Sequence, residues 1–412
     1  MRIDLSDPVT VALSPPGEQR WSFTQFPALS RLPSGRILLM YADAPDASES
    51  HGEPGVAFIS ADDGETWQSY AGEPVATRPH FAVTPLPDGA ALIVPSGRYY
   101  DCVDAGWSLP APASTAHVYG TLYTHRCDEL PAEVQDYFRH LPAPRYDPAT
   151  GAWHDDVVDY DMRDRLAWGR EGSTLLPRPF FERAAHVHGG EVMFADYRVR
   201  FVMDDGTVPP KGCTWLMVSG DGGRSFTRRA LVGGDPTGRD LMGEAALATT
   251  AAGDLVCVVR RADQEQKPMG ITRSRDAGHT WEPVADLFDF GVFPNLLCLG
   301  NGILVLSYGR PGVHLAFASD GEERRWAAHT AVIEGDPADI QRHSCGYTSL
   351  LRLSPDACLL AYSDFRPAGA VGQQHKRSGQ ITRRTIRQRD AWDIGLERRL
   401  HGDGDLVALP GA

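Results

Sequence analysis

The sequence predicts an all-β fold: a single six-bladed β-propeller of four-stranded antiparallel sheets that spans residues 1–412. Three observations predict it: a composition rich in turn residues and aromatics, six apolar hairpins, and a recurring Ser-x-Asp motif. The chain has 42 Gly, 31 Pro and 9 Trp, and hardly any long apolar run has helical spacing, which favours many short strands over helices.

Each hairpin consists of an apolar stretch, a tight turn with Gly, Asp or Asn, and a second apolar stretch. The six are FPALSRLPSGRILLMYA, HFAVTPLPDGAALIVPSG, ERAAHVHGGEVMFADY, EAALATTAAGDLVCVVRR, PNLLCLGNGILVLSYGR and YTSLLRLSPDACLLAYSD. A spacing of roughly 45 to 60 residues per unit suits a propeller blade, and propellers usually have 4 to 8 blades. The second unit carries an insertion around 101–170, with room for a short helix. The segment DLSDPVTVALS is expected to pair with the last sheet and close the ring.

The Ser-x-Asp motif recurs at SADDGETW (60–67), SGDGGRSF (219–226) and SRDAGHTW (274–281), and in an eroded form at SDGEERRW (319–326). In such a turn the Ser and Asp side chains can hydrogen-bond neighbouring backbone groups, Gly allows the bend, and the final aromatic residue packs between sheets. We interpret the motif as structural, at the outer periphery and away from any site.

Composition excludes several classes of function. A net charge of −14 without a basic run disfavours nucleic acid and anionic membranes as partners. No stretch approaches the roughly 20 apolar residues of a membrane span, and the first residues lack a secretion signal, so a cytoplasmic location is expected. The seven cysteines are scattered without a CxxC pair, and no metal site or cofactor is expected.

A hairpin brings the start of its first strand and the end of its second strand to the same end of the sheet. Six hairpins around an axis therefore gather these positions at one mouth. The polar residues there are Gln25, Asp43, His80, Arg98, Glu182, Arg183, Asp196, Arg198, Glu244, Arg260, Arg261, Asn295, Arg310, Tyr347, Asp364 and Arg366. Because arginine dominates in an acidic chain, the mouth is expected to bind an anionic carbohydrate, most simply through a carboxylate.

Six such units with these motifs resemble the sialidase superfamily over nearly the whole chain. The resemblance implies that Arg260, in VVRR, and Arg310, in SYGRPGVHLAFASDG, clamp a substrate carboxylate, with Arg261 as the alternative to Arg260. Tyr347, in CGYTSLL, would be the nucleophile and Glu244, in GEAALAT, its base. A phenol with a pKa near 10 needs such a carboxylate to take its proton.

Two positions remain open or differ from that family. The general acid is expected on the loop ADAPDASESHGEPGVAF, where Glu49 best fits the spacing and Asp46 and Asp43 are alternatives. At the first strand, QFPAL places Gln25 where sialidases have an arginine, so a charge is missing. His80, His343 and Arg98 are expected to reshape the pocket for a different sugar. His80, Arg98 and Arg183 are further candidates for substrate binding.

The favoured function is therefore a retaining, exo-acting glycosidase of sialidase type, which cleaves a terminal sialic acid or a related anionic sugar. The first alternative is a propeller lyase or hydrolase for a non-sialic glycan, such as a uronic-acid polysaccharide or an arabinofuranoside. The second is a carbohydrate-binding propeller without catalysis. Because binding alone does not require a polarised phenol, Tyr347 and Glu244 favour an enzyme.

Overall fold

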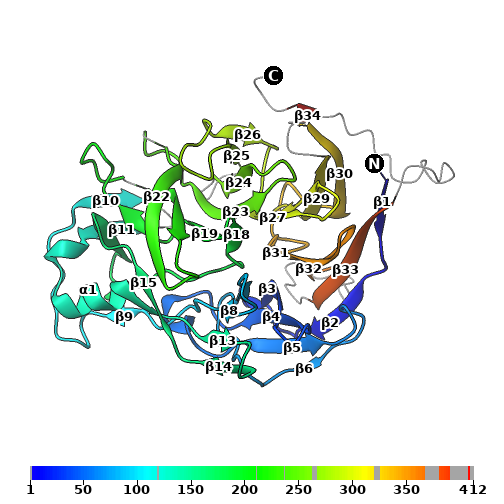
Figure 1. The fold of residues 1–412 in the computed structure, drawn as a ribbon, viewed down its shortest axis with the longest axis horizontal. Coiled ribbons are helices and arrows are strands. Elements are labelled where there is room, and N and C mark those ends of the chain that lie inside the picture. The colour runs from blue at the N-terminus through cyan, green and yellow to red at the C-terminus, as the bar shows by residue number, and fades with distance from the viewer. Residues whose placement is uncertain are drawn as a thin grey trace.

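The computed structural model describes residues 2–117, 120–209, 211–235, 237–261, 267–319, 325–366, 380–389 and 407–408. Nearly all regular structure in these ranges is β, and the sheets lie around a common centre (Figure 1). The innermost labelled strands of that view are β3, β8, β18, β23, β27 and β31. No helix in the described ranges is long and apolar enough to cross a membrane.

The first three sheets follow one another along the chain. The first contains β3 (Phe23–Arg31), β4 (Ile37–Asp43), β5 (Val56–Ser60) and β6 (Gln68–Ser69), with η1 (Ser48–Ser50) after β4. The second contains β7 (Thr84–Pro85), β8 (Ala91–Leu92), β13 (Arg145–Asp147) and β14 (Ala152–His154). The third contains β18 (His186–His188), β19 (Glu191–Asp196), β21 (Thr214–Ser219) and β22 (Ser225–Gly233), extended by β15 (Val157–Tyr160) and β12 (His140–Pro142).

The last three sheets continue in the same order. The fourth contains β23 (Gly243–Thr249), β24 (Leu255–Arg260), β25 (Met269–Ser274) and β26 (Ala285–Leu287). The fifth contains β27 (Val292–Cys298), β28 (Ile303–Gly309), β29 (Val313–Ser319), β30 (Arg325–Ile333) and β34 (Val407–Ala408). The sixth contains β31 (Thr348–Ser354), β32 (Ala357–Asp364) and β33 (Gln380–Arg389), to which β1 (Arg2–Leu5) and β2 (Val9–Leu13) pair. This pairing confirms the predicted closure by the N-terminal segment.

The strands are apolar on both faces because each sheet packs between two others. Leu38 and Met40 on β4 pack toward the second sheet, whereas Leu39 and Tyr41 pack toward the sixth. Successive side chains of a strand point to opposite faces, so a strand with two covered faces is apolar throughout. Four similar clusters lie between the other neighbouring sheets, and the last sheet packs on the first.

Two predicted hairpins are shorter than expected. In the second, β7 and β8 have two residues each, because Pro85 and Pro87 lack the N–H that a ladder needs. In the third, the first strand begins at His186 and not at Glu182. Bonding between neighbouring strands therefore starts four residues later than the apolar pattern suggested.

The stretch around 101–170 is divided between a separate subdomain and the second and third sheets. The subdomain contains β9 (Tyr100–Asp101), β10 (Ser114–His117), β11 (Thr121–Arg126), η2 (Cys127–Glu129), α1 (Ala132–Arg139) and β16 (Arg165–Arg170) from this stretch. Two later strands, β17 (Leu175–Leu176) and β20 (Arg200–Phe201), pair with β9 and β16. Helix α1 confirms the expected short helix and packs Val134 and Phe138 on Cys127. The strands β13 and β14, by contrast, belong to the second sheet.

The Ser-x-Asp turns have the predicted hydrogen bonds. In the third of them, Ser274 Oγ donates to Asp276 Oδ1 at 2.8 Å, and Thr280 Oγ1 donates to Asp276 Oδ2 at 2.6 Å. The indole N–H of Trp281 donates to Gly278 O at 3.2 Å. The turns at 60–67 and 219–226 have equivalent Ser–Asp bonds, while most of the turn at 319–326 lies outside the described residues. All three described turns join the third and fourth strands of their sheets, as expected for a structural role.

Candidate active site

The strands that carry the candidate residues are irregular at their ends. The pairing of β23 with β24 is interrupted between Gly243 and Ala246, and that of β27 with β28 between Val292 and Asn295. Within these β-bulges, Glu244 has φ 47° and Phe293 has φ 44°. Non-glycine residues rarely adopt positive φ, and bulges redirect side chains near functional sites. The bulges aim Glu244 and Phe293 at the residue that precedes β31, Tyr347.

Tyr347 and Glu244 form the centre of the site. The Tyr347 hydroxyl donates to Glu244 Oε1 at 2.5 Å, although the two residues are 103 positions apart. Arg260 Nη1 donates to the same oxygen at 2.8 Å, and the backbone N–H of Phe293 donates to Glu244 Oε2 at 2.8 Å. Both carboxylate oxygens are thus held, and one of them faces the phenol.

The electrostatics of this pair keep the shared proton on the phenol in the resting protein. Burial raises the pKa of the Glu244 carboxyl, but Arg260 and the Tyr347 hydroxyl outweigh it, and the pKa lies below its ordinary value. Burial and the adjacent Glu244 raise the pKa of Tyr347 well above its ordinary value. At neutral pH the pair is therefore a neutral phenol hydrogen-bonded to a carboxylate.

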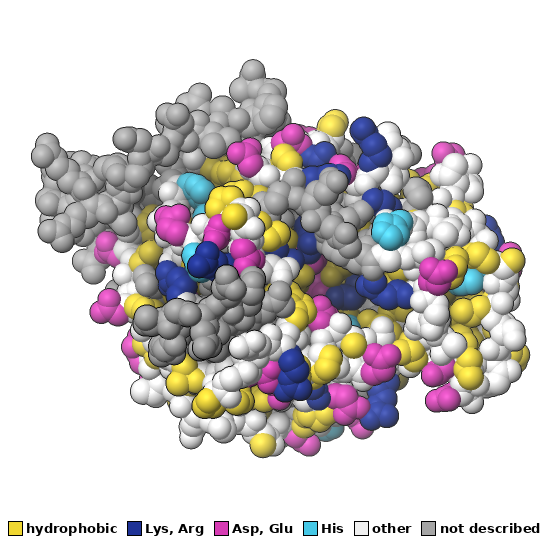
Figure 2. All heavy atoms as spheres, turned by 180° about the vertical axis from the view of Figure 1, so that it is seen from behind, with side chains coloured by type: hydrophobic (Ala, Val, Ile, Leu, Met, Phe, Trp, Pro, Cys, Tyr) yellow, Lys and Arg dark blue, Asp and Glu magenta, His cyan; other side chains and the backbone are white. Residues whose placement is uncertain are grey.

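Arg310 lies on the other side of Tyr347. Its Nε and Nη2 donate to Cys345 O at 3.2 and 2.9 Å, two residues before Tyr347. Its Cζ is 5.4 Å from the ring centroids of both Trp21 and Tyr347. The structure thus brings Tyr347, Glu244, Arg260 and Arg310 together. In the view from behind, Lys and Arg side chains gather around a hollow near the middle of the molecule (Figure 2).

Aromatic rings surround Tyr347 and restrict its motion. The ring centroids of Phe293 and Phe26 are 4.5 and 4.7 Å from that of Tyr347. The His80 ring stacks on Phe293 at 4.8 Å, and burial lowers the pKa of His80 to about 4. His80 is therefore neutral and forms part of the floor beneath the tyrosine.

Several predicted residues lie elsewhere. Gln25 has 0% exposure, and its amide atoms have no hydrogen-bond partner among the described residues. It is covered by its neighbours and does not occupy an open arginine-like position. Arg261 pairs with Asp240 at 3.5 Å and contacts Asp286, because successive residues after a strand point to opposite sides. It therefore does not replace Arg260.

The remaining predicted residues lie at the surface of the protein or along its central channel. Arg98 pairs with Glu53, and 81% of its side chain is exposed. Asp46 and Glu49 are exposed on the loop after β4, while Asp43 lies 3.6 Å from Arg78. Within the described residues, no hydrogen bond joins these carboxylates to Tyr347, whose hydroxyl bonds Glu244. Arg183 lines a central channel, as described below.

A second charged group next to the pair was not predicted as a site. Glu182 accepts a hydrogen bond from the Tyr197 hydroxyl at 2.9 Å and from Arg198. Burial opposes its charge, but Arg198, His80 and Arg183 together lower the pKa of Glu182 to about 2. The segment FFERAA carried the signal, two adjacent charges within a buried apolar run. In the described ranges, no group of three or more His, Cys, Asp or Glu residues could hold a metal ion.

Comparison with solved structures shows a β-propeller fold that this chain shares with an arabinanase, a sialidase and a protein of unknown function. A protein of unknown function from Dyadobacter fermentans is 18% identical, with a TM-score of 0.58 over 94% of this chain and 99% of that one. An α-L-arabinanase from Penicillium chrysogenum, solved with arabinobiose, is 15% identical, with a TM-score of 0.52 over 92% and 98%. A Hadza microbial sialidase is 14% identical, with a TM-score of 0.50 over 84% and 64%. No family model matches this chain, and no curated protein matches it.

Proposed function

We propose that the protein is a retaining glycoside hydrolase on a six-bladed propeller and that it releases a terminal anionic sugar of the sialic acid type. The observation that carries the proposal is the 2.5 Å hydrogen bond from Tyr347 Oη to Glu244 Oε1, with Arg260 and Arg310 beside it. Neither a structural role nor simple sugar binding requires a buried phenol to share a carboxylate.

In the proposed reaction, Tyr347 Oη attacks the anomeric carbon while its proton passes to Glu244 Oε1. The bond between that carbon and the leaving-group oxygen breaks, and the protonated carboxylic acid of a loop residue such as Glu49, Asp46 or Asp43 gives its proton to this oxygen and becomes a carboxylate. Water, losing a proton to the same loop residue, then displaces the tyrosyl oxygen, which recovers its proton from Glu244. Two displacements at one carbon retain its configuration.

Charge around the pair supports an anionic substrate. Arg183, Arg198, Arg260 and Arg310 face two carboxylates, Glu182 and Glu244, which leaves two formal positive charges in a protein of net charge −14. A carboxylate on the sugar would offset this excess. A neutral nucleophile also avoids repelling such a substrate, which a carboxylate nucleophile would not.

The position of Gln25 favours a second candidate, a hydrolase for a non-sialic sugar. With Gln25 fully buried, the site lacks one charge of the sialidase clamp. A sugar with a more weakly anionic or differently placed group would need only Arg260 and Arg310. A neutral arabinofuranoside, which needs no carboxylate clamp, is another substrate to test, given the fold shared with an arabinanase.

Turnover of a panel of aryl glycosides tests the proposal. The panel should contain sialosides, ketodeoxy sugar acids, glucuronides and arabinofuranosides, and proton NMR should follow the first-formed anomer. We expect hydrolysis of an anionic glycoside with retained configuration. An inverted product, or an unsaturated product typical of a lyase, would contradict the proposal.

A further inference from the structure

The two bulges that aim Glu244 and Phe293 need support from outside their own strands. Each interrupts its ladder and holds a non-glycine residue at positive φ. Such a conformation is disfavoured and persists only where surrounding contacts enforce it. Glu244 depends on both bulges, because its own backbone lies in one and the N–H that binds its Oε2 lies in the other.

Arg183 bonds both bulges at once. Its Nη1 donates to Ala245 O at 3.0 Å and its Nη2 donates to Pro294 O at 2.8 Å. These carbonyls belong to the residues that directly follow Glu244 and Phe293. The guanidinium carbon also lies 3.9 Å from the centroid of the Phe293 ring. One planar group therefore ties the two backbones together and packs against the ring that stacks on Tyr347.

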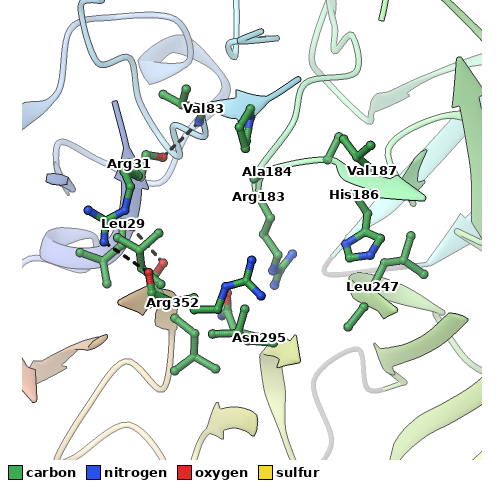
Figure 3. A pocket seen from close by; sticks show the side chains of 18 of the residues that line it. Leu29, Arg31, Val83, Arg183, Ala184, His186, Val187, Leu247, Asn295 and Arg352 are labelled. Carbon is green, nitrogen blue, oxygen red and sulfur yellow. Dashed lines mark hydrogen bonds between the residues drawn. The ribbon is translucent and has the colours of Figure 1, made fainter. Parts of the chain in front are cut away.

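Arg183 reaches this position from a central channel. The channel has a volume of about 1130 Å³ and is lined by strands of all six sheets, and Arg183, Asn295, Arg352 and His186 lie around it (Figure 3). Glu182 lies 3.6 Å from Arg183 and is itself held by Tyr197 and Arg198. Arg183 thus lies beside the channel and bonds the backbone from that side. Its Nη1 and Nη2 each donate to a backbone carbonyl oxygen, Ala245 O and Pro294 O.

We propose that Arg183 is a positioning residue for the Tyr347–Glu244 pair and not a substrate-binding arginine. By joining the carbonyls after Glu244 and Phe293, it holds Glu244 Oε1 where it meets the Tyr347 hydroxyl. The planar fork of arginine suits two carbonyls, and a lysine ammonium would bond only one of them well. The catalytic part of this inference rests on the proposed function, whereas the structural part does not.

The test compares Arg183→Met and Arg183→Lys with a matched control, Arg145→Met. Arg145 is similarly buried and also bonds two backbone carbonyls, Gly222 O at 3.0 Å and Gly223 O at 2.9 Å, but in a turn away from the site. Hydrogen exchange is measured on peptides that cover 243–249, 292–298 and 219–226. Kinetics are measured on the best glycoside of the panel.

We expect both Arg183 variants to speed exchange several-fold in 243–249 and 292–298, and Arg145→Met to affect only 219–226. We also expect kcat to fall by roughly 10- to 100-fold with KM nearly unchanged, because a small misplacement of a catalytic group has such an effect. A third variant, Arg183→Ala, leaves space for a free guanidinium ion. Low concentrations of guanidinium should restore part of kcat in Arg183→Ala but not in Arg183→Met, because the methionine side chain fills that space.

Unchanged exchange in both peptides would overturn the inference, whatever the activity. A rise in KM at constant kcat would also overturn it, because it would indicate direct contact with substrate. If the wild-type protein hydrolyses no glycoside, the proposed function fails, and the exchange data alone then decide whether Arg183 holds the two bulges.

Discussion

At the residue scale, the site depends on one proton that Tyr347 holds tightly and Glu244 holds weakly. Burial acts on both groups in the same direction, since it disfavours both anions. Arg260 and the phenol then lower the pKa of Glu244, while the carboxylate raises that of Tyr347 further. The sequence alone predicted this pair through a family resemblance, because no local pattern links residues 103 positions apart.

Replacement of the nucleophile should separate chemistry from binding. In Tyr347→Phe the ring still packs on Phe293 and Phe26, so the fold and the arginines should be preserved. We expect kcat to fall by about 10³-fold or more, because the attacking atom is gone. The calorimetric Kd of the substrate should change by less than about tenfold, a bound set by the loss of one net hydrogen bond. Full activity would eliminate the tyrosine mechanism and leave a carboxylate such as Glu244 as nucleophile.

Gln25 should respond to substitution as a buried residue and not as part of a clamp. Gln25→Leu removes two unpartnered amide atoms and should stabilise the fold by about 1 kcal/mol. Gln25→Arg places a charge at a position of 0% exposure and should destabilise it by at least about 2 kcal/mol. Urea unfolding measures both. A stable Gln25→Arg protein with tighter sialic acid binding would instead show that this position opens to the site.

At the element scale, apolar pattern and turn chemistry predicted the hairpins but not their irregularities. Continuous apolar runs and Gly turns indicate where β4 and β28 lie, and these strands pair regularly with β5 and β29. They give no sign of the bulges at Glu244 and Phe293, because positive φ at Glu or Phe follows from tertiary contacts such as those of Arg183. The same reason explains why Arg183 and Arg261 were predicted in the substrate pocket: the sequence places a residue at a strand end, but not the direction of its side chain.

The Ser-x-Asp turns should contribute stability without affecting catalysis. Asp221 accepts hydrogen bonds from Ser219 Oγ, from the backbone N–H groups of Arg224 and Ser225, and from Ser225 Oγ. Because the turn is largely exposed, we expect Asp221→Ala to reduce the free energy of unfolding by only about 1 to 2 kcal/mol. Arg224→Ala, in the same turn, should change it little. A loss of turnover in folded Asp221→Ala would contradict a purely structural role.

At the scale of the whole molecule, the sequence predicted a closed ring and the structure explains why closure is needed. Each sheet is apolar on both faces, so an open end would expose one such face to water. Pairing of β1 and β2 with β33 places the N-terminal strands in the sixth sheet, beside the first. Parallel pairing of β15 with β22 was not predictable, because it depends on how the inserted subdomain folds back.

Several histidines are buried in the folded protein, and their burial makes the free energy of unfolding depend on pH. Burial lowers the pKa of His51 to about 3 and those of His80, His186 and His314 to about 4. The unfolded chain binds protons at these residues below pH 6.5, whereas the folded chain stays neutral until about pH 4. Protonation therefore favours unfolding as pH falls from 6.5 to 4, by up to about 1.4 kcal/mol per pH unit for each histidine.

Carboxylates do not account for a loss of folding stability between about pH 6.5 and pH 4.5. Glu182 has a folded pKa of about 2, so its contribution persists above pH 4.5 and declines only below that value.

We therefore expect the free energy of unfolding, measured with urea between pH 7 and pH 5, to fall by at least about 1.4 kcal/mol per pH unit below pH 6.5. His314 packs among Tyr308, Phe290 and His329, and its ring Nε2 forms a hydrogen bond with Pro311 O. His314→Phe keeps an aromatic ring there but removes the titrating group, so the slope of the unfolding free energy against pH should fall by the contribution of one proton. A flat profile between pH 6.5 and pH 5 would show that these histidines are protonated in the folded protein.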